Sequence, residues 1–65
     1  MNKIEFLTRL EKAKIRFYGR FLAENYGIYD SGNNIRLASV DHTEVTLTQY
    51  GEDRLRQYNP DGTRC

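Results

Sequence analysis

Few side chains in this chain are of the types that perform catalysis or bind metal ions. There is one histidine, His42, and one cysteine, Cys65. His42 lies in a predicted turn, and its immediate neighbours, Asp41 and Thr43, include no Ser or Cys nucleophile that it would activate. A structural zinc site needs about four ligands, mostly Cys and His, and these two residues do not suffice. We therefore predict that the protein is not an enzyme and has no metal or cofactor site.

Tyrosine and arginine are abundant, with five Tyr and seven Arg in 65 residues. Both types are enriched at protein interfaces, where a few side chains carry most of the binding energy. Basic side chains repeat at helical spacing near the N-terminus, and one Tyr and one Arg are predicted to project from the outer face of a sheet. The predicted partner-binding residues are Arg9, Lys12, Arg16, Arg20, Tyr29 and Arg36. The remaining tyrosines Tyr18, Tyr50 and Tyr58 are predicted to wall off the core.

Residues 3–25 are predicted to form one long amphipathic helix. Asn2 and Glu5 have the spacing of a capping box. At about 100° per residue the apolar side chains fall on one arc, and the four basic side chains fall on the opposite arc. Gly19 lowers the helix propensity there by up to about 1 kcal/mol, and turn formers at residues 25–27 end the helix. The basic arc faces either phosphates, an acidic protein or only solvent.

The period of the apolar pattern then changes from helical to alternating. The segments IRLASV and EVTLT alternate apolar and polar residues, with a hairpin connection at residues 41–43. An isolated hairpin is marginal in water, so YGIY is predicted to add a third strand. In that arrangement Tyr26 and Ile28 point toward the core and Tyr29 points away from it. The loop between YGIY and IRLASV, residues 30–34, consists of turn formers.

A short helix is predicted to follow the sheet. Thr48 is its N-cap and Pro60 ends it. Gly51 and Leu55 share one face, and Gly51 lets that face approach the sheet closely. The predicted fold class is α+β: a long N-terminal helix packed on a three-stranded antiparallel meander, with a short C-terminal helix. Residues 1–58 form the single domain, and residues 59–65 are predicted to be a flexible tail.

Composition excludes several classes of protein. Apolar residues make up 38% and charged residues 29% of the chain, which is typical of a folded domain. The net charge is only +1; residues 1–24 carry +3 and residues 25–65 carry −2. No apolar run approaches the roughly 18 residues of a membrane span, and we find no signal peptide. With a lone cysteine, these features predict a cytoplasmic protein.

The segment LTQYGEDRL, residues 47–55, resembles the point at which the wing of many winged-helix transcription factors runs into their final helix. The resemblance rests on a strand end, an N-cap, a glycine and a core leucine within about residues 44–58. It implies a small DNA-binding regulator that places a basic helix on phosphates and uses the hairpin as a wing. The chain departs from that pattern because one long helix, and not a helix-turn-helix, is predicted before the sheet.

Three functions remain after this elimination. The leading hypothesis is a stoichiometric inhibitor or adaptor that binds a larger protein or nucleoprotein complex. Phage or mobile-element inhibitors of host nucleic-acid machinery, of the anti-CRISPR or anti-restriction type, are of this kind. The alternative is the winged-helix-like DNA-binding regulator. The third is a structural subunit that forms a homodimer through a sheet edge or an apolar face.

Overall fold

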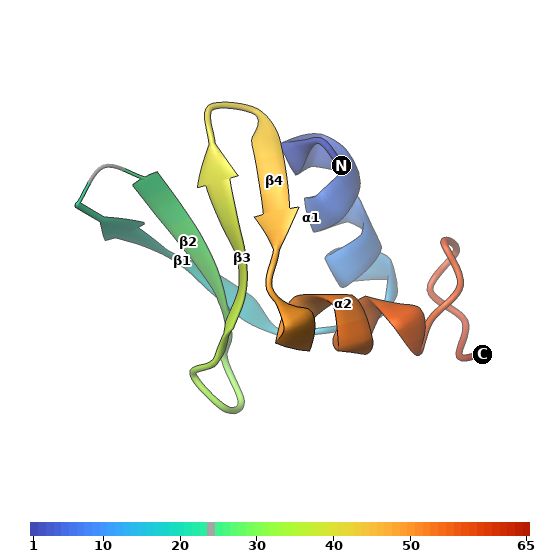
Figure 1. Cartoon of the computed structure of the whole chain (residues 1–65). Coiled ribbons are helices and arrows are strands. Elements are labelled where there is room, and N and C mark those ends of the chain that lie inside the picture. The colour runs from blue at the N-terminus through green and yellow to red at the C-terminus, as the bar shows by residue number, and fades with distance from the viewer. Residues whose placement is uncertain (24) are drawn as a thin grey trace.

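The described part of the chain forms two helices and one antiparallel sheet (Figure 1). The computed structural model describes residues 1–23 and 25–65, and for residue 22 it describes the backbone alone. The elements in chain order are α1 (Lys3–Lys12), β1 (Phe17–Leu22), β2 (Asn25–Asp30), β3 (Arg36–Asp41), β4 (Glu44–Leu47) and α2 (Gln49–Arg56). The strands lie in the order β1-β2-β3-β4. The predicted α+β class is confirmed, but the sheet has four strands where three were expected.

The prediction of one helix over residues 3–25 is wrong, because α1 ends at Lys12. The Ile15 N–H donates to the Leu10 carbonyl at 3.0 Å and the Lys14 N–H donates to the Glu11 carbonyl at 3.1 Å. This pair of hydrogen bonds is a Schellman motif, which ends a helix with a residue in the left-handed conformation. Lys14 is that residue, with φ of 59°. Because the position usually holds glycine, the stop signal is not visible in the sequence.

Residues that were assigned to the second half of the helix form β1 instead. Phe17 and Phe21 are four residues apart, and residues at that spacing share a face in a helix and also in a strand. Gly19 lies between them, and the Tyr26 ring from β2 covers it so closely that a Cβ there would lie 1.4 Å from the Tyr26 hydroxyl oxygen. The aromatic residues thus satisfy both patterns, and pairing with β2 favours the strand. The predicted helix also included Glu24, which lies outside the described residues.

The core lies between the two helices and one face of the sheet. Its most deeply buried large side chains are Phe6, Leu10, Ile28 and Leu37. Leu55 anchors α2, and Gly51 brings that helix so close to β3 that a Cβ would lie 2.0 Å from the Leu37 carbonyl oxygen. The predicted close approach at Gly51 is therefore confirmed. Neither helix in the described part of the chain is long and apolar enough to cross a membrane.

Both predicted N-caps are confirmed. The Asn2 side chain accepts the Glu5 N–H at 2.7 Å, and the Thr48 hydroxyl accepts the Gly51 N–H at 3.1 Å. Such caps satisfy N–H groups that have no partner within the helix, and each contributes about 1 kcal/mol. They fix the starts of α1 and α2 relative to the sheet.

The last residues fold back on themselves beside the end of α1. Asn59 and Thr63 are joined by backbone and side-chain hydrogen bonds, and the Cys65 N–H donates to the Gln57 carbonyl at 2.9 Å. A Cβ at Gly62 would lie 2.2 Å from the Lys12 carbonyl oxygen. Residues 59–65 thus form a hydrogen-bonded turn, and their predicted flexibility stays a prediction.

Candidate binding surface

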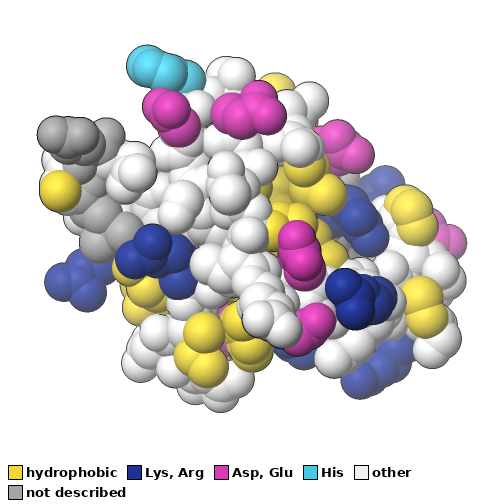
Figure 2. Space-filling view, viewed as in Figure 1, with side chains coloured by type: hydrophobic (Ala, Val, Ile, Leu, Met, Phe, Trp, Pro, Cys, Tyr) yellow, Lys and Arg dark blue, Asp and Glu magenta, His cyan; other side chains and the backbone are white. Residues whose placement is uncertain are grey.

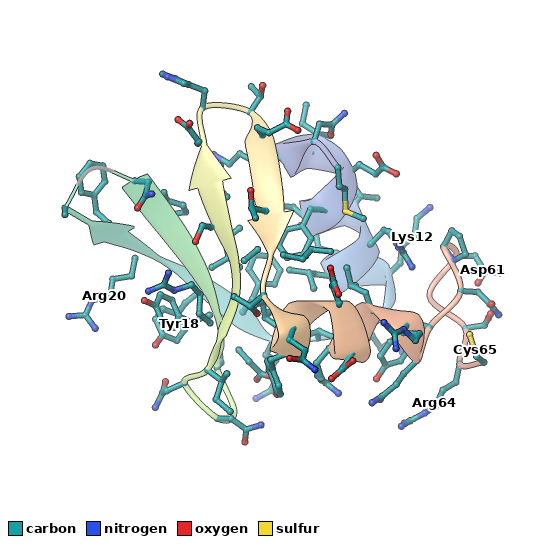
Figure 3. The ribbon with its side chains drawn as sticks, in the orientation of Figure 1. Lys12, Tyr18, Arg20, Asp61, Arg64 and Cys65 are labelled. Carbon is teal, nitrogen blue, oxygen red and sulfur yellow. The ribbon has the colours of Figure 1, made fainter. Side chains whose placement is uncertain are left out.

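The basic helix face predicted from the sequence does not form. Arg9 and Lys12 lie on α1, Arg16 lies between α1 and β1, and Arg20 lies on β1. Figure 3 shows Lys12 beside Asp61 at one end of the view, with Arg20 and Tyr18 near the other end. The sequence prediction places the four cations on one surface because it extends one helix over residues 3–25, whereas the turn at Lys14 separates them.

Arg9 packs within the fold and does not project into solvent as predicted. It is half-buried, and its guanidinium donates to the Tyr58 carbonyl at 3.4 Å. Its Nε is enclosed without a hydrogen-bond partner among the described residues. The side chain borders an open hollow of about 450 Å³, whose other lining residues are Met1, Leu47, Glu52, Leu55, Arg56 and Tyr58. Arg9 therefore joins α1 to the end of α2, in place of projecting from a basic surface.

Two of the predicted binding residues, Tyr29 and Arg36, do come together on the sheet. The Arg36 guanidinium carbon lies 5.9 Å from the centre of the Tyr29 ring, within cation–π range. On the other side of Tyr29, the Tyr18 ring stacks at a centroid distance of 5.4 Å and an interplanar angle of 13°. The three side chains thus form a row across β1, β2 and β3, which we call the Tyr–Arg row.

The strand register positions this row. Tyr18 pairs with Tyr29, and Tyr29 pairs with Arg36 next to a register shift in the β2–β3 ladder. Residues directly opposite one another in an antiparallel ladder point to the same face, so the strand pairing makes the three side chains neighbours. Their face is the one opposite the buried Ile28, and the helices pack on the Ile28 side. As predicted, Tyr29 points away from the core.

Polar groups hold the row in place. The Tyr18 hydroxyl donates to Asn34 Oδ1 at 3.1 Å, and Arg36 Nη1 donates to Ser39 Oγ at 3.3 Å. Arg20 extends the same face of β1 and is exposed. Figure 2 shows Lys or Arg side chains beside hydrophobic ones on the left of the molecule, where β1 and β2 lie. This face therefore combines ordered aromatic rings with one held arginine, Arg36, and one exposed arginine, Arg20.

Tyr18 is the member of this surface that was missed from the sequence. It was expected to wall off the core, but it is 37% exposed on the open sheet face. Tyr50 and Tyr58, by contrast, pack against the core as expected. The signal that would have placed Tyr18 correctly is the alternation in FYGRFL, which puts Tyr18 and Arg20 on the face opposite Phe17 and Phe21.

The single histidine of the chain lies beside an acidic side chain at the β3–β4 turn. His42 lies 3.7 Å from Asp41, but both side chains are almost fully exposed in the β3–β4 turn. Within residues 1–23 and 25–65, no group of three or more His, Cys, Asp and Glu side chains is arranged to hold a metal ion. His42 also borders a hollow of about 550 Å³, whose other lining residues are Asn2, Lys3, Ile4, Leu7 and Thr43.

Asp30 is the one acidic side chain that is buried in the described part of the chain. The Tyr50 hydroxyl donates to its Oδ2 at 2.6 Å, the Gly32 N–H donates to its Oδ1 at 2.8 Å, and Arg54 Nε lies 3.5 Å from Oδ2. The hydrogen bond from Tyr50 is the main cause that lowers the pKa of Asp30, against the opposing effect of burial. The same bond raises the pKa of Tyr50. The ionised carboxylate of Asp30 therefore links the end of β2 to α2 and has a structural role.

Comparison of the chain with models of protein families, with curated proteins and with solved structures gave no match. The interpretation of the open sheet face therefore depends on its own geometry and charge.

Proposed function

We propose that the protein is a non-enzymatic binding module that acts stoichiometrically, as an inhibitor or adaptor, on a larger protein or nucleoprotein complex. Its working surface is the open sheet face, with the Tyr–Arg row at the centre and Arg20 beside it. The observation that carries the proposal is the ordering of this row on a face that neither helix covers. Aromatic and arginine side chains that are already held in place lose little entropy on binding.

The use of the ring faces favours a protein partner over single-stranded nucleic acid. Bases bind such surfaces by stacking on free aromatic faces. One face of Tyr29 is occupied by Tyr18 and the other by Arg36. The central ring of the row therefore has no free face, and the row offers mainly hydroxyls, guanidinium groups and one outer face of Tyr18, which suit the polar and aromatic contacts of a protein interface.

The charge distribution also favours a protein partner over nucleic acid. The chain has a net charge of +1, and Asp41 and Glu44 lie at the far end of the β3–β4 hairpin. A surface that binds nucleic acid through its phosphates is usually strongly basic. A mixed surface with two arginines near its centre matches a protein that carries carboxylates opposite Arg20 and Arg36.

The winged-helix alternative has weaker support. Residues 3–22 contain one helix followed by one strand, so they do not supply the two helices that precede a wing. The narrower proposal of a phage or mobile-element inhibitor of host nucleic-acid machinery rests on small size, composition and the elimination of other classes.

Affinity capture with the tagged protein tests this function. The wild-type chain is incubated with a lysate of its source cells, with and without nuclease, and captured proteins are quantified. We expect a stoichiometric protein partner that survives nuclease treatment and moderate salt. Recovery of nucleic acid alone, with binding that falls by orders of magnitude between about 50 and 200 mM salt, would contradict the proposal and favour the DNA-binding alternative.

Two charge reversals locate the surface. Arg36→Glu reverses a cation in the Tyr–Arg row, whereas Arg56→Glu reverses an exposed cation on α2. We expect the first variant to lose the captured partner and the second to retain it, with both unfolding at similar temperatures. Equal capture by both variants would show that the partner binds elsewhere.

A further inference from the structure

The two edge strands of the sheet, β1 and β4, differ in whether other residues cover their outer backbone groups. On the β4 edge, the Val45 N–H donates to the Met1 carbonyl at 3.0 Å and the Lys3 N–H donates to the Thr43 carbonyl at 2.9 Å. Residues at the N-terminus therefore cover that edge. The β1 edge lies at the other end of the strand order, as Figure 1 shows. Unprotected edges pair readily with other strands, so proteins usually cover them or add charge to them.

The hydrogen-bonding pattern shows which groups of β1 face outward. The Ser31 N–H donates to the Arg16 carbonyl, whereas the Asp30 N–H is directed to the Ile35 carbonyl on the β3 side. Bonded and non-bonded pairs alternate along an antiparallel ladder, so Tyr18 and Arg20 bond to β2. The backbone groups of Phe17, Gly19 and Phe21 then point away from the sheet. Apart from the β1–β2 ladder, none of the backbone hydrogen bonds of the described residues involves these three.

The side chains of β1 do not protect its edge. Within this strand Arg20 is the single charged residue, and there is no proline. Phe21 is 75% exposed, which is unusual for a large aromatic side chain in a strand. An exposed aromatic residue beside three sets of free backbone groups marks an interaction edge, and not an edge that has been shielded from pairing.

We propose that β1 pairs antiparallel with β1 of a second copy of this chain, with Gly19 of each copy at the two-fold axis. In this register Gly19 faces Gly19, Phe17 faces Phe21 of the second copy, and Tyr18 faces Arg20 of the second copy. The outward backbone groups of Phe17, Gly19 and Phe21 bond to one another across the axis. The product is one continuous eight-stranded sheet made from two four-stranded sheets.

Each pair in this register is complementary. Phe17 and Phe21 lie on the helix-covered face, where a shallow groove of about 170 Å³ is lined by Lys3, Leu7, Phe17, Gly19, Tyr26 and Ile28. Aromatic pairs at directly opposite positions stabilise antiparallel sheets. On the open face, the Arg20 guanidinium of one copy reaches the free face of the Tyr18 ring of the other, which forms a cation–π contact.

Neighbouring registers lack this complementarity. Moving the axis to Arg20 places the two Arg20 side chains directly opposite each other, and like charges at such positions are destabilising. Moving it to Tyr18 places Arg20 opposite Arg16 of the second copy. Registers offset by a single residue would bring the core face of one copy against the open face of the other. The axis at Gly19 is the arrangement that pairs each cation with a ring.

The dimer would extend the Tyr–Arg row. Across the axis the order on the open face becomes Arg36, Tyr29, Tyr18 and then Arg20 of the second copy, repeated in reverse by symmetry. The proposed protein-binding function does not require the β1–β1 dimer. The dimer is measured on the purified chain without a protein partner, so each proposal can fail while the other holds.

Sedimentation equilibrium over a range of protein concentrations tests the dimer. We expect the wild-type chain to approach twice its 7.7 kDa mass. Phe21→Lys should weaken the dimer at least about tenfold, because it places an ammonium group against an aromatic ring edge and the groove. Ile4→Lys is the matched control, since Ile4 is 79% exposed on α1 and borders a hollow with His42 and Thr43 at the β3–β4 turn. A wild-type chain that remains a monomer at about 1 mM, or a dimer that Phe21→Lys leaves unchanged, overturns the proposal.

Disulfide trapping tests the register. Tyr18→Cys and Arg20→Cys are prepared separately, each with Cys65→Ser to remove the native thiol. Opposite residues in a non-hydrogen-bonded pair have Cα atoms about 4.5 Å apart, which a disulfide can span. We expect the mixture of the two variants to form the mixed disulfide faster than either variant alone forms a symmetric one. Preferential self-linking of Arg20→Cys would overturn the Gly19 axis.

Discussion

The Tyr50 hydroxyl donates a 2.6 Å hydrogen bond to Asp30 Oδ2 and so ties the first turn of α2 to the end of β2. The Asn33 amide donates to the same hydroxyl at 2.8 Å, which makes Tyr50 the link between a buried carboxylate and the β2–β3 turn. A contact of this kind between elements that are distant in the sequence stabilises the fold.

Removal of this hydroxyl should destabilise the protein. We expect Tyr50→Phe to lower the free energy of unfolding by about 1.5–3 kcal/mol, the range for hydrogen bonds to charged groups. Urea denaturation followed by circular dichroism measures this difference. Tyr58→Phe is the control, because that ring also packs on the core while its hydroxyl forms no hydrogen bond among the described residues. Equal losses in both variants would show that the hydroxyl of Tyr50 has no special role.

The same hydrogen bonds predict a particular dependence of stability on pH. The hydrogen bond from Tyr50, together with the one from the Gly32 N–H, lowers the pKa of Asp30 from its usual value of 3.8. A carboxyl whose pKa is lower in the folded state contributes stability that is fully present above its unfolded pKa and is lost as pH falls through the folded pKa. We therefore expect stability to decrease below about pH 4.

The variant Asp30→Asn isolates this contribution to acid stability. It should be less stable than the wild type at neutral pH, and its stability should fall less steeply below about pH 4. Urea midpoints measured from neutral to acid pH give both curves. Parallel curves for the two proteins would assign the acid sensitivity to other carboxylates, such as Asp61, whose pKa is lowered by hydrogen bonds from Thr63.

Lys14 offers a direct test of where α1 ends. Its φ of 59° is a conformation that costs a residue with a side chain about 1–2 kcal/mol relative to glycine. We expect Lys14→Gly to raise the free energy of unfolding by about 0.5–1 kcal/mol, since the greater flexibility of glycine in the unfolded chain offsets part of the gain. Glu11→Gly, at an exposed position inside α1, should lower it by about 1 kcal/mol. If residues 3–25 formed one helix, both substitutions would be destabilising.

Lys14 also explains how far the fold could be predicted from the sequence. The helix caps at Asn2 and Thr48 and the close packing at Gly51 were predicted because each depends on residue types a few positions apart. The end of α1 depends on a lysine in a conformation that its type does not signal. Once that turn was missed, β1 was lost with it, because Phe17 and Phe21 fit a helix and a strand equally well.

The members of the candidate surface were also predicted only where nearby residues signal them. Arg36 was predicted on the open sheet face from the alternation in IRLASV, and Tyr29 from the assumed pairing of YGIY with that segment. Tyr18 and Arg20 join the same face because β1 pairs with β2, and the alternation in FYGRFL was not used because a helix was predicted over these residues. Arg9, Lys12 and Arg16 were predicted on one surface from a helical period that ends before the last of them. Local patterns therefore identified the residue types of the surface, and tertiary pairing determined its members.

Gly19 and Tyr26 provide a final prediction about β1. A Cβ at position 19 would lie 1.4 Å from the Tyr26 hydroxyl oxygen and 2.1 Å from Tyr26 Cζ, so a side chain there must displace the ring. The ring packs against the core, and the Lys3 ammonium lies 5.6 Å from its centre. We expect Gly19→Ala to lower the free energy of unfolding by about 1–3 kcal/mol, as for other overpacked sites.

A double-mutant cycle with Tyr26→Ala separates this clash from the intrinsic effect of alanine. Alanine is preferred to glycine within a strand by about 0.5–1 kcal/mol. With the ring removed, we therefore expect Gly19→Ala to be neutral or stabilising, which gives a coupling between the two sites of at least about 1 kcal/mol. Urea denaturation of the four proteins supplies the cycle. Additive effects would mean that the Tyr26 ring does not cover Gly19, and β1 would then lack the contact that holds its centre against β2.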